Sequence, residues 1–429
     1  MTENKAEELE KVWTGIKTAG GRVAFVERQL EELGLAVERK PTDGMSKKQL
    51  GAYKRALKAE AAKRSELMRV SWEAHFAHHV VHVGEGIYWN DEDDWDKYDH
   101  PRAEERIAQN ELPRLDSPAA LAEALGITIP ELRWLTYHRE AATSIHYDRF
   151  TIPKNNGSGE RAIWAPKPKL KAAQRWILRE IAERLPVHGA AHGFVAGRSI
   201  YTNAARHTDS KIVVKMDLKD FFPSVTFPRV KGVFRKAGYR EQVATLLALI
   251  CTEPPREVVT HGGQTYFVAM GPRCLPQGAP TSPAITNALA LRLDRRLDGL
   301  AKHLGWRYTS YADDLTFSLP SGHEGEERLG SLLGGVKAIV SAEGFTLHPD
   351  KTRVMRSGRR QQVTGMIVNG PGTPRVPREI RRRARAVAHN VQAGKPIKAG
   401  ESLQTWLGYA AYIYMTDREL GAELIKQLG

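Results

Sequence analysis

Two adjacent carboxylates, Asp313 and Asp314, follow Tyr311-Ala312 at the expected turn of a strand-turn-strand in residues 306–319. A third carboxylate, Asp217, ends the apolar run of residues 211–217, which predicts a buried central strand. Adjacent strands would bring the three side chains together. Their hard oxygens suit Mg²⁺, which usually takes one or two protein carboxylates per ion and leaves its other positions to water and substrate phosphate. Two such ions, about 3.5–4 Å apart, can stabilise both oxygens when a hydroxyl attacks a nucleoside triphosphate. Taken alone, the turn is equally compatible with an acidic hairpin in which Asp is only a turn former.

Three further segments accompany the carboxylates in a fixed order. Residues 150–175 predict a hairpin with an Asn-Asn-Gly-Ser-Gly turn and a basic helix start, residues 217–222 read DLKDFF, and residues 275–283 form a Pro- and Gly-rich loop before a helical stretch. In this order the motifs resemble those of the reverse transcriptase family, along more than half of the chain. The resemblance implies that Asp217, Asp313 and Asp314 are catalytic and hold two Mg²⁺ ions, which Mn²⁺ could replace. Asp220 lies one step off the strand face of Asp217, so it is left out of the metal site and could cap a helix instead.

The resemblance also implies which residues bind the incoming nucleotide. A lysine and an arginine of the hairpin match the triphosphate-binding cations, and a forked guanidinium suits phosphate oxygens. A bulky ring matches the steric gate against a ribose 2′-hydroxyl, a Gln-Gly pair would lie near the sugar, and a second lysine matches the proton donor to pyrophosphate. In chain order these residues are Lys154, Arg161, Phe222, Gln277, Gly278 and Lys351. Plainer alternatives are exposed surface charges, a core aromatic ring and a Pro-Gly loop that binds nothing.

Two more elements narrow the resemblance to retron reverse transcriptases. Residues 203–207, Asn-Ala-Ala-Arg-His, resemble the retron NAxxH element, and residues 363–365 resemble the VTG element where the palm meets the thumb. The resemblance implies that Asn203, His207, Val363, Thr364 and Gly365 take part in recognition of the enzyme's own RNA. A hydrogen-bonded structural loop and the end of a strand are the alternatives.

A retron enzyme, by this resemblance, is an RNA-directed DNA polymerase that uses dNTPs to copy part of a cognate noncoding RNA (msr-msd). Synthesis starts from a 2′-hydroxyl of a guanosine in that RNA, so the product is a branched, RNA-linked single-stranded DNA (msDNA). No RNase H domain fits in the remaining sequence, and host RNase H is therefore the expected partner for removal of the template RNA. The family's role in antiphage defence implies an effector protein that the sequence does not identify.

Three other hypotheses stay open. A group II intron maturase shares the polymerase motifs, but it normally has a longer region beyond the thumb than the roughly sixty residues that follow Gly365. A diversity-generating reverse transcriptase shares the metal site, but residues 275–283 lack its expected Ser-Gln variant. A nonenzymatic RNA-binding or effector-holding scaffold is a protein of another class, and the complete set of three carboxylates argues against it.

Charge is distributed unevenly along the 429 residues, whose formal net charge is +14. Residues 1–150 carry 22 Lys and Arg against 27 Asp and Glu, or −5, which leaves +19 for residues 151–429. The positive field favours phosphate backbones and predicts salt-dependent binding. The two cysteines, Cys251 and Cys274, form no metal pattern and indicate a reducing compartment. No apolar stretch approaches the length of a membrane span, and no signal peptide is recognised, so we expect a cytoplasmic protein with no membrane partner.

The expected fold class is α+β: a right-hand polymerase with fingers, a palm built on an antiparallel sheet and a helical thumb, preceded by a mainly helical N-terminal extension. Residues 1–110 form that extension, with helical periodicity in residues 6–29 and 47–70 and no assigned role. Residues 111–140 are a short helical lead-in, either a helix-turn-helix or a pair that packs on the fingers. Residues 141–370 form fingers and palm, and residues 371–429 form an RNA-binding thumb.

A predicted thumb helix carries a dense group of arginines, namely Arg378, Arg381, Arg382, Arg383 and Arg385. They are spread around more than one helical face, so some should contact phosphate while others are only solvated. From charge density, Arg381, Arg382 and Arg385 are assigned to RNA recognition.

Four histidines, His75, His78, His79 and His82, precede an acidic run at residues 91–96. Their spacing puts three of them on one helix face. No cysteine accompanies them and no HExxH motif is present, so a polar helix face is favoured over a zinc or manganese site.

Overall fold

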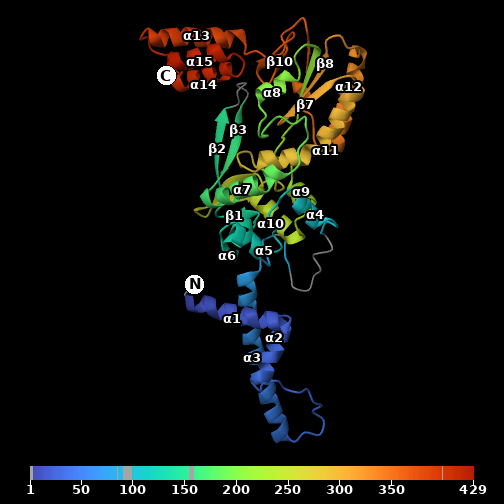
Figure 1. Ribbon diagram of the computed structural model, residues 1–429. Coiled ribbons are helices and arrows are strands. Elements are labelled where there is room, and N and C mark those ends of the chain that lie inside the picture. Colours follow the sequence, from blue (N-terminus) through green and yellow to red (C-terminus); the bar gives the residue numbers. More distant parts are fainter. Residues whose placement is uncertain (1–2, 85, 90–98, 154–158, 399) are drawn as a thin grey trace. The chain divides into compact units, whose positions relative to one another are not determined.

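The structure is a computed structural model that describes residues 3–84, 86–89, 99–153, 159–398 and 400–429. Its contacts divide the chain into two compact units, which are described separately (Figure 1). The smaller unit contains residues 1–98, 115–139 and 240–246, and the larger unit contains residues 99–114, 140–239 and 247–429. These units cross the boundaries expected from the sequence, because residues 99–114 group with the larger unit. The functional division of the chain stays a prediction.

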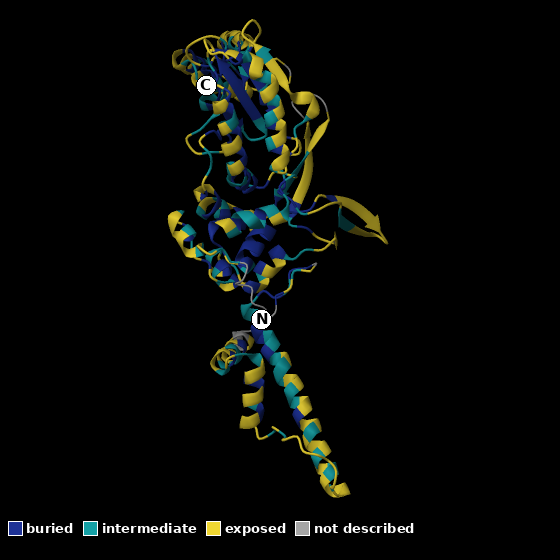
Figure 2. Cartoon of the chain, turned by 90° about the vertical axis from the view of Figure 1, so that its right-hand side faces the viewer, coloured by how far each residue is buried: buried dark blue, intermediate teal, exposed yellow. Residues whose placement is uncertain are grey.

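A four-stranded antiparallel sheet lies at the centre of the larger unit. Its strand order is β7-β8-β4-β9, formed by β7 (Arg307–Tyr311), β8 (Asp314–Pro320), β4 (Ser210–Asp217) and β9 (Arg353–Arg356). Ile212, Val213 and Val214 of β4 are fully buried, because this strand has a neighbour on each side and helices over the sheet. Figure 2 shows strands of this unit in the buried colour beside helices with exposed outer faces. The buried central strand expected in residues 211–217 is therefore confirmed.

Three helices support this sheet. Helix α11 (Ser282–His303) packs against β7, α9 (Phe227–Ala237) and α12 (Leu329–Ala342). Leu293 and Leu297 of α11 and Val336 of α12 are buried in the resulting core. Helix α11 carries a proline in its first turn, where a missing N–H costs no hydrogen bond. The Pro- and Gly-rich loop thus ends at the start of a well-anchored helix.

Two hairpins extend the larger unit. β2 (Tyr147–Pro153) pairs with β3 (Glu160–Pro166) as the sequence predicts, and α7 (Pro168–Glu180) follows. The turn residues 154–158 lie outside the described residues. β5 (Arg256–His261) and β6 (Gln264–Ala269) form a second hairpin around two glycines with positive φ, and β1 (Ala141–Ala142) adds a third strand. This second hairpin was not expected from the sequence.

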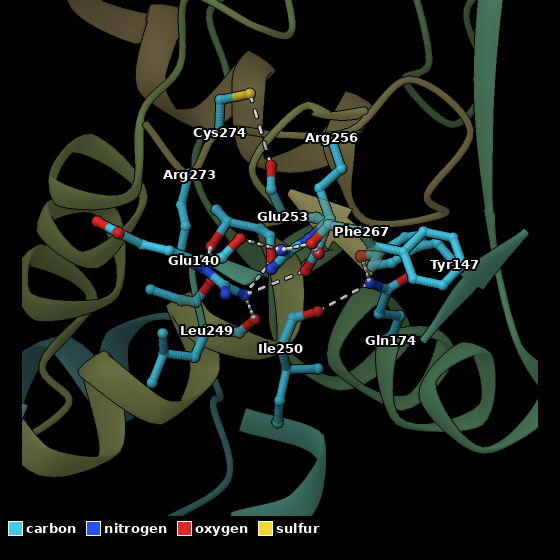
Figure 3. Close-up of polar contacts among 12 residues, drawn as sticks. Glu140, Tyr147, Gln174, Leu249, Ile250, Glu253, Arg256, Phe267, Arg273 and Cys274 are labelled. Atoms are coloured by element: carbon cyan, nitrogen blue, oxygen red, sulfur yellow. Dashed lines mark hydrogen bonds and ion pairs between the residues drawn. The ribbon is translucent and has the colours of Figure 1, made fainter. Parts of the chain in front are cut away.

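A buried ionic network anchors the second hairpin (Figure 3). The carboxylate of Glu253 lies 2.7 Å from Nε of Arg256 and 3.6 Å from an Nη atom of Arg273. Arg256 also donates to the backbone oxygens of Glu140 and Phe267 at 3.1 and 2.9 Å. The backbones of Glu253 and Cys274 exchange two hydrogen bonds, of 3.0 and 3.2 Å. Since Cys274 directly precedes the loop of residues 275–281, the network fixes the entry into that loop.

Three helices, α13 (Arg378–Gln392), α14 (Leu403–Tyr414) and α15 (Arg418–Leu428), form the C-terminal part. Trp406, Ala410 and Ile413 of α14 share one buried cluster with residues of α13 and α15, so α14 is a core helix. None of the helices among the described residues is long and apolar enough to span a bilayer.

The remaining elements described outside the two hairpins and the central sheet are α4 (Ala103–Gln109), η2 (Ala182–Arg184), α8 (Ile200–Ala205), α10 (Glu241–Cys251), η3 (Glu326–Arg328), η4 (Pro349–Lys351), β10 (Gln362–Val363) and β11 (Met366–Ile367).

The smaller unit is helical. It contains α1 (Glu3–Ala19), α2 (Arg22–Glu32), α3 (Lys47–His78), α5 (Pro118–Ala124) and α6 (Ile129–Thr136). The periodic stretch of residues 6–29 is broken into α1 and α2 by Gly20 and Gly21, whose φ angles of 83° and 139° leave the helical region. Ser46 starts α3 with a capping box.

Helix α3 ends at His78, so the expected single helix face does not reach His82, but the histidines at the helix end pack on an aromatic ring. The Trp13 ring lies 5.0 Å from that of His78, in a stacked arrangement, and 4.9 Å from that of His79. His78 also lies 3.1 Å from a carboxylate oxygen of Glu10. Among the described residues, no group of three or more His, Cys, Asp or Glu side chains has a metal-binding arrangement. The acidic run of residues 91–96 lies outside the described residues.

Candidate active site

The strand register brings Asp217 and Asp314 together. The two are direct partners in the β4–β8 ladder, so their side chains leave the same face of the sheet. Asp313 lies in the two-residue turn between β7 and β8, where Ala312 has a φ of 53°. The backbone of the turn is tied to β4, because the Leu218 amide donates to the Asp313 carbonyl at 2.8 Å. The register therefore brings Asp217 and Asp314 together, as the sequence predicts, with Asp313 in the adjoining turn, and their role as a metal site stays a prediction.

Two lysines accompany the carboxylates. Lys351 Nζ lies 2.8 Å from Asp217 Oδ1, and Lys215 Nζ lies 3.3 Å from Asp314 Oδ2. The pKa of Asp313 is raised, first because the side chain is largely buried and then because Asp217 and Asp314 are negative neighbours. Lys215 was missed from the sequence, although it precedes Asp217 by two residues and so lies on the same strand face.

The donor set fits divalent metal ions. Burial and the repulsion between neighbouring carboxylates raise the pKa of Asp313. Added positive charge is therefore stabilising at this position. Within the described part of the chain, three carboxylates are not already gathered in a closed metal-binding cluster. This does not oppose the assignment, since Mg²⁺ usually takes one or two protein carboxylates per ion. Two of the three carboxylates are held by ammonium groups that an incoming cation would replace.

The other predicted nucleotide-binding residues lie in several elements. Arg161 is exposed on β3, and Lys154 lies outside the described residues. Phe222 is half-buried in the turn after β4, with its ring 5.5 Å from that of Phe221. Asp220, which could have capped a helix, does not do so, because the N-cap of α9 is Thr226 and Asp220 has a φ of 48° within a turn.

The loop of residues 275–281 contacts the β2–β3 hairpin. The amide of Trp164 on β3 donates to the carbonyl of Gln277 at 2.8 Å. Gly278 has a φ of 119°, and a Cβ added there would lie 2.7 Å from the Trp164 carbonyl oxygen. This glycine is therefore required by the close approach of β3, a reason that the sequence did not reveal. Its expected role beside a substrate stays a prediction.

The NAxxH and VTG elements meet in the structure, although they are separated by about 160 residues. Thr364 and Gly365 form the two-residue turn of the β10–β11 hairpin, with φ angles of 43° and 86°. Positive φ at both positions is typical of a type I′ turn, where glycine is favoured and a β-branched residue is strained. The Thr364 hydroxyl donates to the Ile200 carbonyl at 2.9 Å and accepts from the Asn203 amide at 3.5 Å. Helix α8 therefore holds the strained turn.

Buried side chains dominate this region. His207 bonds Ser318 Oγ at 2.8 Å and Thr309 Oγ1 at 2.7 Å, and burial lowers its pKa to about 3. Asn203 and Val363 are also fully buried. These three side chains have no surface to offer to RNA, whereas Gly365 is exposed. Any part they have in RNA recognition would be indirect, through the shape of the turn, and that part is untested.

On α13, Arg382 and Arg385 are exposed and Arg381 is half-buried. Arg383 pairs with Glu401 and lies over the Trp406 ring. The arginines are thus divided between solvent and internal contacts, and the phosphate contacts expected for some of them stay a prediction. Cys251 and Cys274 are unpaired and buried, and burial raises their pKa values to about 12 and 11.

Comparison with known proteins places the chain in a family. Residues 152–394 match the family described as "Reverse transcriptase (RNA-dependent DNA polymerase)". The chain is 53% identical to the retron Mx162 reverse transcriptase of Myxococcus xanthus over 423 residues, which cover 96% of this chain and 87% of that protein. It is 44% identical to the retron Mx65 reverse transcriptase of the same organism over 76% of this chain and 74% of that protein.

A more distant relative is also a retron reverse transcriptase. The chain is 30% identical to the retron Ec86 reverse transcriptase of Escherichia coli over 305 residues, 71% of this chain and 87% of that protein. The fold is that of a reverse transcriptase, and the enzyme is an RNA-directed DNA polymerase. Within that class the chain belongs to the retron reverse transcriptases.

Proposed function

We propose that this enzyme copies part of a cognate structured noncoding RNA into msDNA, with synthesis primed from an RNA 2′-hydroxyl. The observation that carries the polymerase chemistry is the pairing of Asp217 with Asp314 across β4 and β8, beside Asp313 in the adjoining turn. The RNA and the branched product are carried over from the retron relatives that the chain resembles.

In this proposal the four-stranded sheet is the palm, the β2–β3 hairpin belongs to the fingers, and α13–α15 form the thumb. Asp217, Asp313 and Asp314 hold two divalent cations, which we take to be Mg²⁺. When bound, the ions stabilise charge on the attacking and leaving oxygens. Burial and then the negative neighbours Asp217 and Asp314 raise the pKa of Asp313, and cations bound here would offset the repulsion between the carboxylates.

Other residues orient the nucleotide. Arg161 and Lys154 would contact the triphosphate, and Gln277 and Gly278 would line the sugar. The Phe222 ring lies in the turn after the strand that carries Asp217, and from there it would exclude a ribose 2′-hydroxyl. The support is positional, because the Trp164–Gln277 hydrogen bond links the hairpin that carries Arg161 to the loop that carries Gln277.

Lys351 is proposed to donate a proton to the pyrophosphate leaving group. Its ammonium lies 2.8 Å from Asp217 Oδ1, so it is already within reach of the catalytic carboxylates. To donate its proton, the Lys351 ammonium would leave this ion pair with Asp217.

Recognition of the RNA is proposed to use exposed groups around the VTG turn and on α13. Thr364 and Gly365 present the turn, Asn203 and Val363 support it from the interior, and His207 joins the neighbouring segment to the central sheet. Arg381, Arg382 and Arg385 would contact phosphate, since guanidinium groups on a basic surface bind it without reading sequence. We also propose that host RNase H removes the template RNA. The enzyme would act in antiphage defence together with an effector protein.

The test compares wild type with Asp313→Asn and Asp220→Asn, each expressed with its flanking genomic sequence. Nucleic acid bound to the purified protein is separated on a denaturing gel before and after RNase treatment. Wild type and Asp220→Asn should carry a short DNA of discrete length that RNase shortens without destroying it. Asp313→Asn should carry RNA alone. Bound RNA without DNA in all three proteins would contradict the proposal and support a nonenzymatic scaffold.

A further inference from the structure

One loop of the larger unit lies directly against the catalytic turn. Ala191 forms a parallel bridge with Ser310 at the end of β7, and the His192 amide donates to the Ser310 carbonyl at 2.7 Å. The next residue, Gly193, has no room for a side chain, because an added Cβ would lie 2.5 Å from the Ala312 amide nitrogen. Residues 190–194 therefore follow the backbone of the turn that carries Asp313.

This loop is held rigidly from two sides. The Arg198 guanidinium donates to the carbonyls of His188 and Gly189, each at 3.0 Å, and also to the carbonyl of Ala191. The buried side chain of Asn287 on α11 donates to the Gly193 carbonyl at 2.8 Å. Hydrogen bonds thus fix the backbone on both sides of the position where it meets the catalytic turn.

Phe194, the next residue, combines two unfavourable features. Its φ is 57°, a left-handed conformation that is an outlier for a bulky side chain. The residue is 58% exposed, so burial does not compensate for the backbone strain. Strain that the surroundings enforce is characteristic of functional sites and is a starting point for a hypothesis of function. A single exposed aromatic ring would need no explanation, but one held in this conformation by its neighbours does.

The ring stands beside the carboxylate turn. Its centroid is 6.5 Å from that of Tyr311, two residues before Asp313. In the proposed function, the nucleotide whose hydroxyl attacks the triphosphate must lie at these carboxylates. The base of that nucleotide has an apolar π face, and an exposed aromatic ring offers a sequence-tolerant stacking partner. A polymerase that extends any terminal base needs contacts of this tolerant kind.

We propose that Phe194 is a positioning residue whose ring stacks on the base of the primer-terminal nucleotide. The inference rests on the proposed function for the position of the primer end. The strained backbone fixes the direction of the ring before the primer arrives, which reduces the entropy lost on binding. Stacking then holds the attacking hydroxyl next to the catalytic carboxylates.

The test is an equilibrium binding cycle that does not depend on catalysis. A fluorescent DNA primer on an RNA template is titrated with the full-length protein in the absence of divalent cations, and the Kd is read from anisotropy. The primer ends either in a normal nucleotide or in an abasic one, and the proteins are wild type, Phe194→Ala and Phe194→Trp. Wild type should lose about 5- to 150-fold in affinity when the terminal base is removed, the usual range for one stacked base. Phe194→Ala should bind both primers with the weaker affinity, and Phe194→Trp should restore the preference for the intact primer.

Two further arms make the result specific. An abasic site in the template opposite the primer end should show little coupling to Phe194→Ala. Phe76→Ala, which removes an exposed ring of α3 in the smaller unit, should retain the wild-type preference. Equal losses on base removal in wild type and Phe194→Ala would overturn the proposal, as would a coupling seen only with the template abasic site. Failure of DNA synthesis with the binding coupling intact would contradict the proposed function and leave the stacking contact standing.

Discussion

His207 offers a quantitative test of the buried contact between α8 and the sheet. Its ring bonds Ser318 on β8 and Thr309 on β7, and burial lowers its pKa from 6.5 to about 3. The folded protein therefore favours the neutral ring. The stability that His207 contributes is complete above pH of about 6.5 and is lost as the pH falls toward the folded pKa.

The size of the effect follows from the two pKa values. At pH 5.0, roughly 97% of unfolded chains carry a protonated His207, against about 1% of folded molecules. Since pH 5.0 lies about 1.5 units below the unfolded pKa and above the folded one, the loss relative to pH 7.5 is about 2 kcal/mol. His207→Gln removes the titrating group. At pH 7.5 the variant should be less stable than wild type by roughly 1–3 kcal/mol, because it disturbs two buried hydroxyl contacts. At pH 5.0 that deficit should shrink by about 2 kcal/mol.

Hydrogen exchange read by mass spectrometry measures this locally. Peptides that cover β7 and β8 report the opening free energy of the sheet, after correction for the intrinsic exchange rate at each pH. The buried histidine His192 also titrates, but it is common to both proteins and cancels in the difference. Parallel pH dependences of wild type and His207→Gln in these peptides would refute the argument, because they would show that His207 is not held neutral in the folded state.

Three more substitutions test other parts of the larger unit. Glu253→Ala should destabilise it by about 3–5 kcal/mol in thermal unfolding, because it removes the carboxylate that two buried arginines contact; an effect below about 1 kcal/mol would mean that the network is not buried. Gly193→Ala should lower the rate of primer extension by up to about 100-fold through displacement of the catalytic turn. Gly189→Ala should leave the rate unchanged, because a Cβ added there meets no atom within 4 Å. Gly365→Ala should cost about 1 kcal/mol more than Gly370→Ala, because both have positive φ but only the first Cβ meets a side chain, at 3.2 Å; equal melting temperatures would count against this contact.

The approach of Asp217 to Asp314 could be predicted because its signals are local. An apolar run that ends in Asp217 and a turn that carries two carboxylates each specify a strand end, and strand pairing then joins them. The break at Gly20-Gly21 is a local signal too, although periodicity alone extended the helix across it.

Contacts between distant segments could not be predicted. The hydrogen bonds from Asn203 and Thr364 require the β10–β11 turn to fold onto α8, and nothing in either motif specifies the other. The need for glycine at position 278 comes from Trp164 on another hairpin. The exposure of Phe194 depends on Gly193, Arg198 and Asn287 together. In each case the residue types were plain in the sequence, but their partners follow only from the tertiary fold.

The strand order of the central sheet has a consequence for biosynthesis. Both neighbours of β4 are translated much later, since β8 begins at Asp314 and β9 at Arg353. At roughly 5–20 residues per second, the apolar strand would wait on the order of 5–20 s for its first partner. A nascent chain stalled before Asp314 should therefore expose β4 to protease, and one released after β9 should protect it. The sequence distance between Asp217 and Asp314 thus sets how long the apolar strand stays unpaired during synthesis.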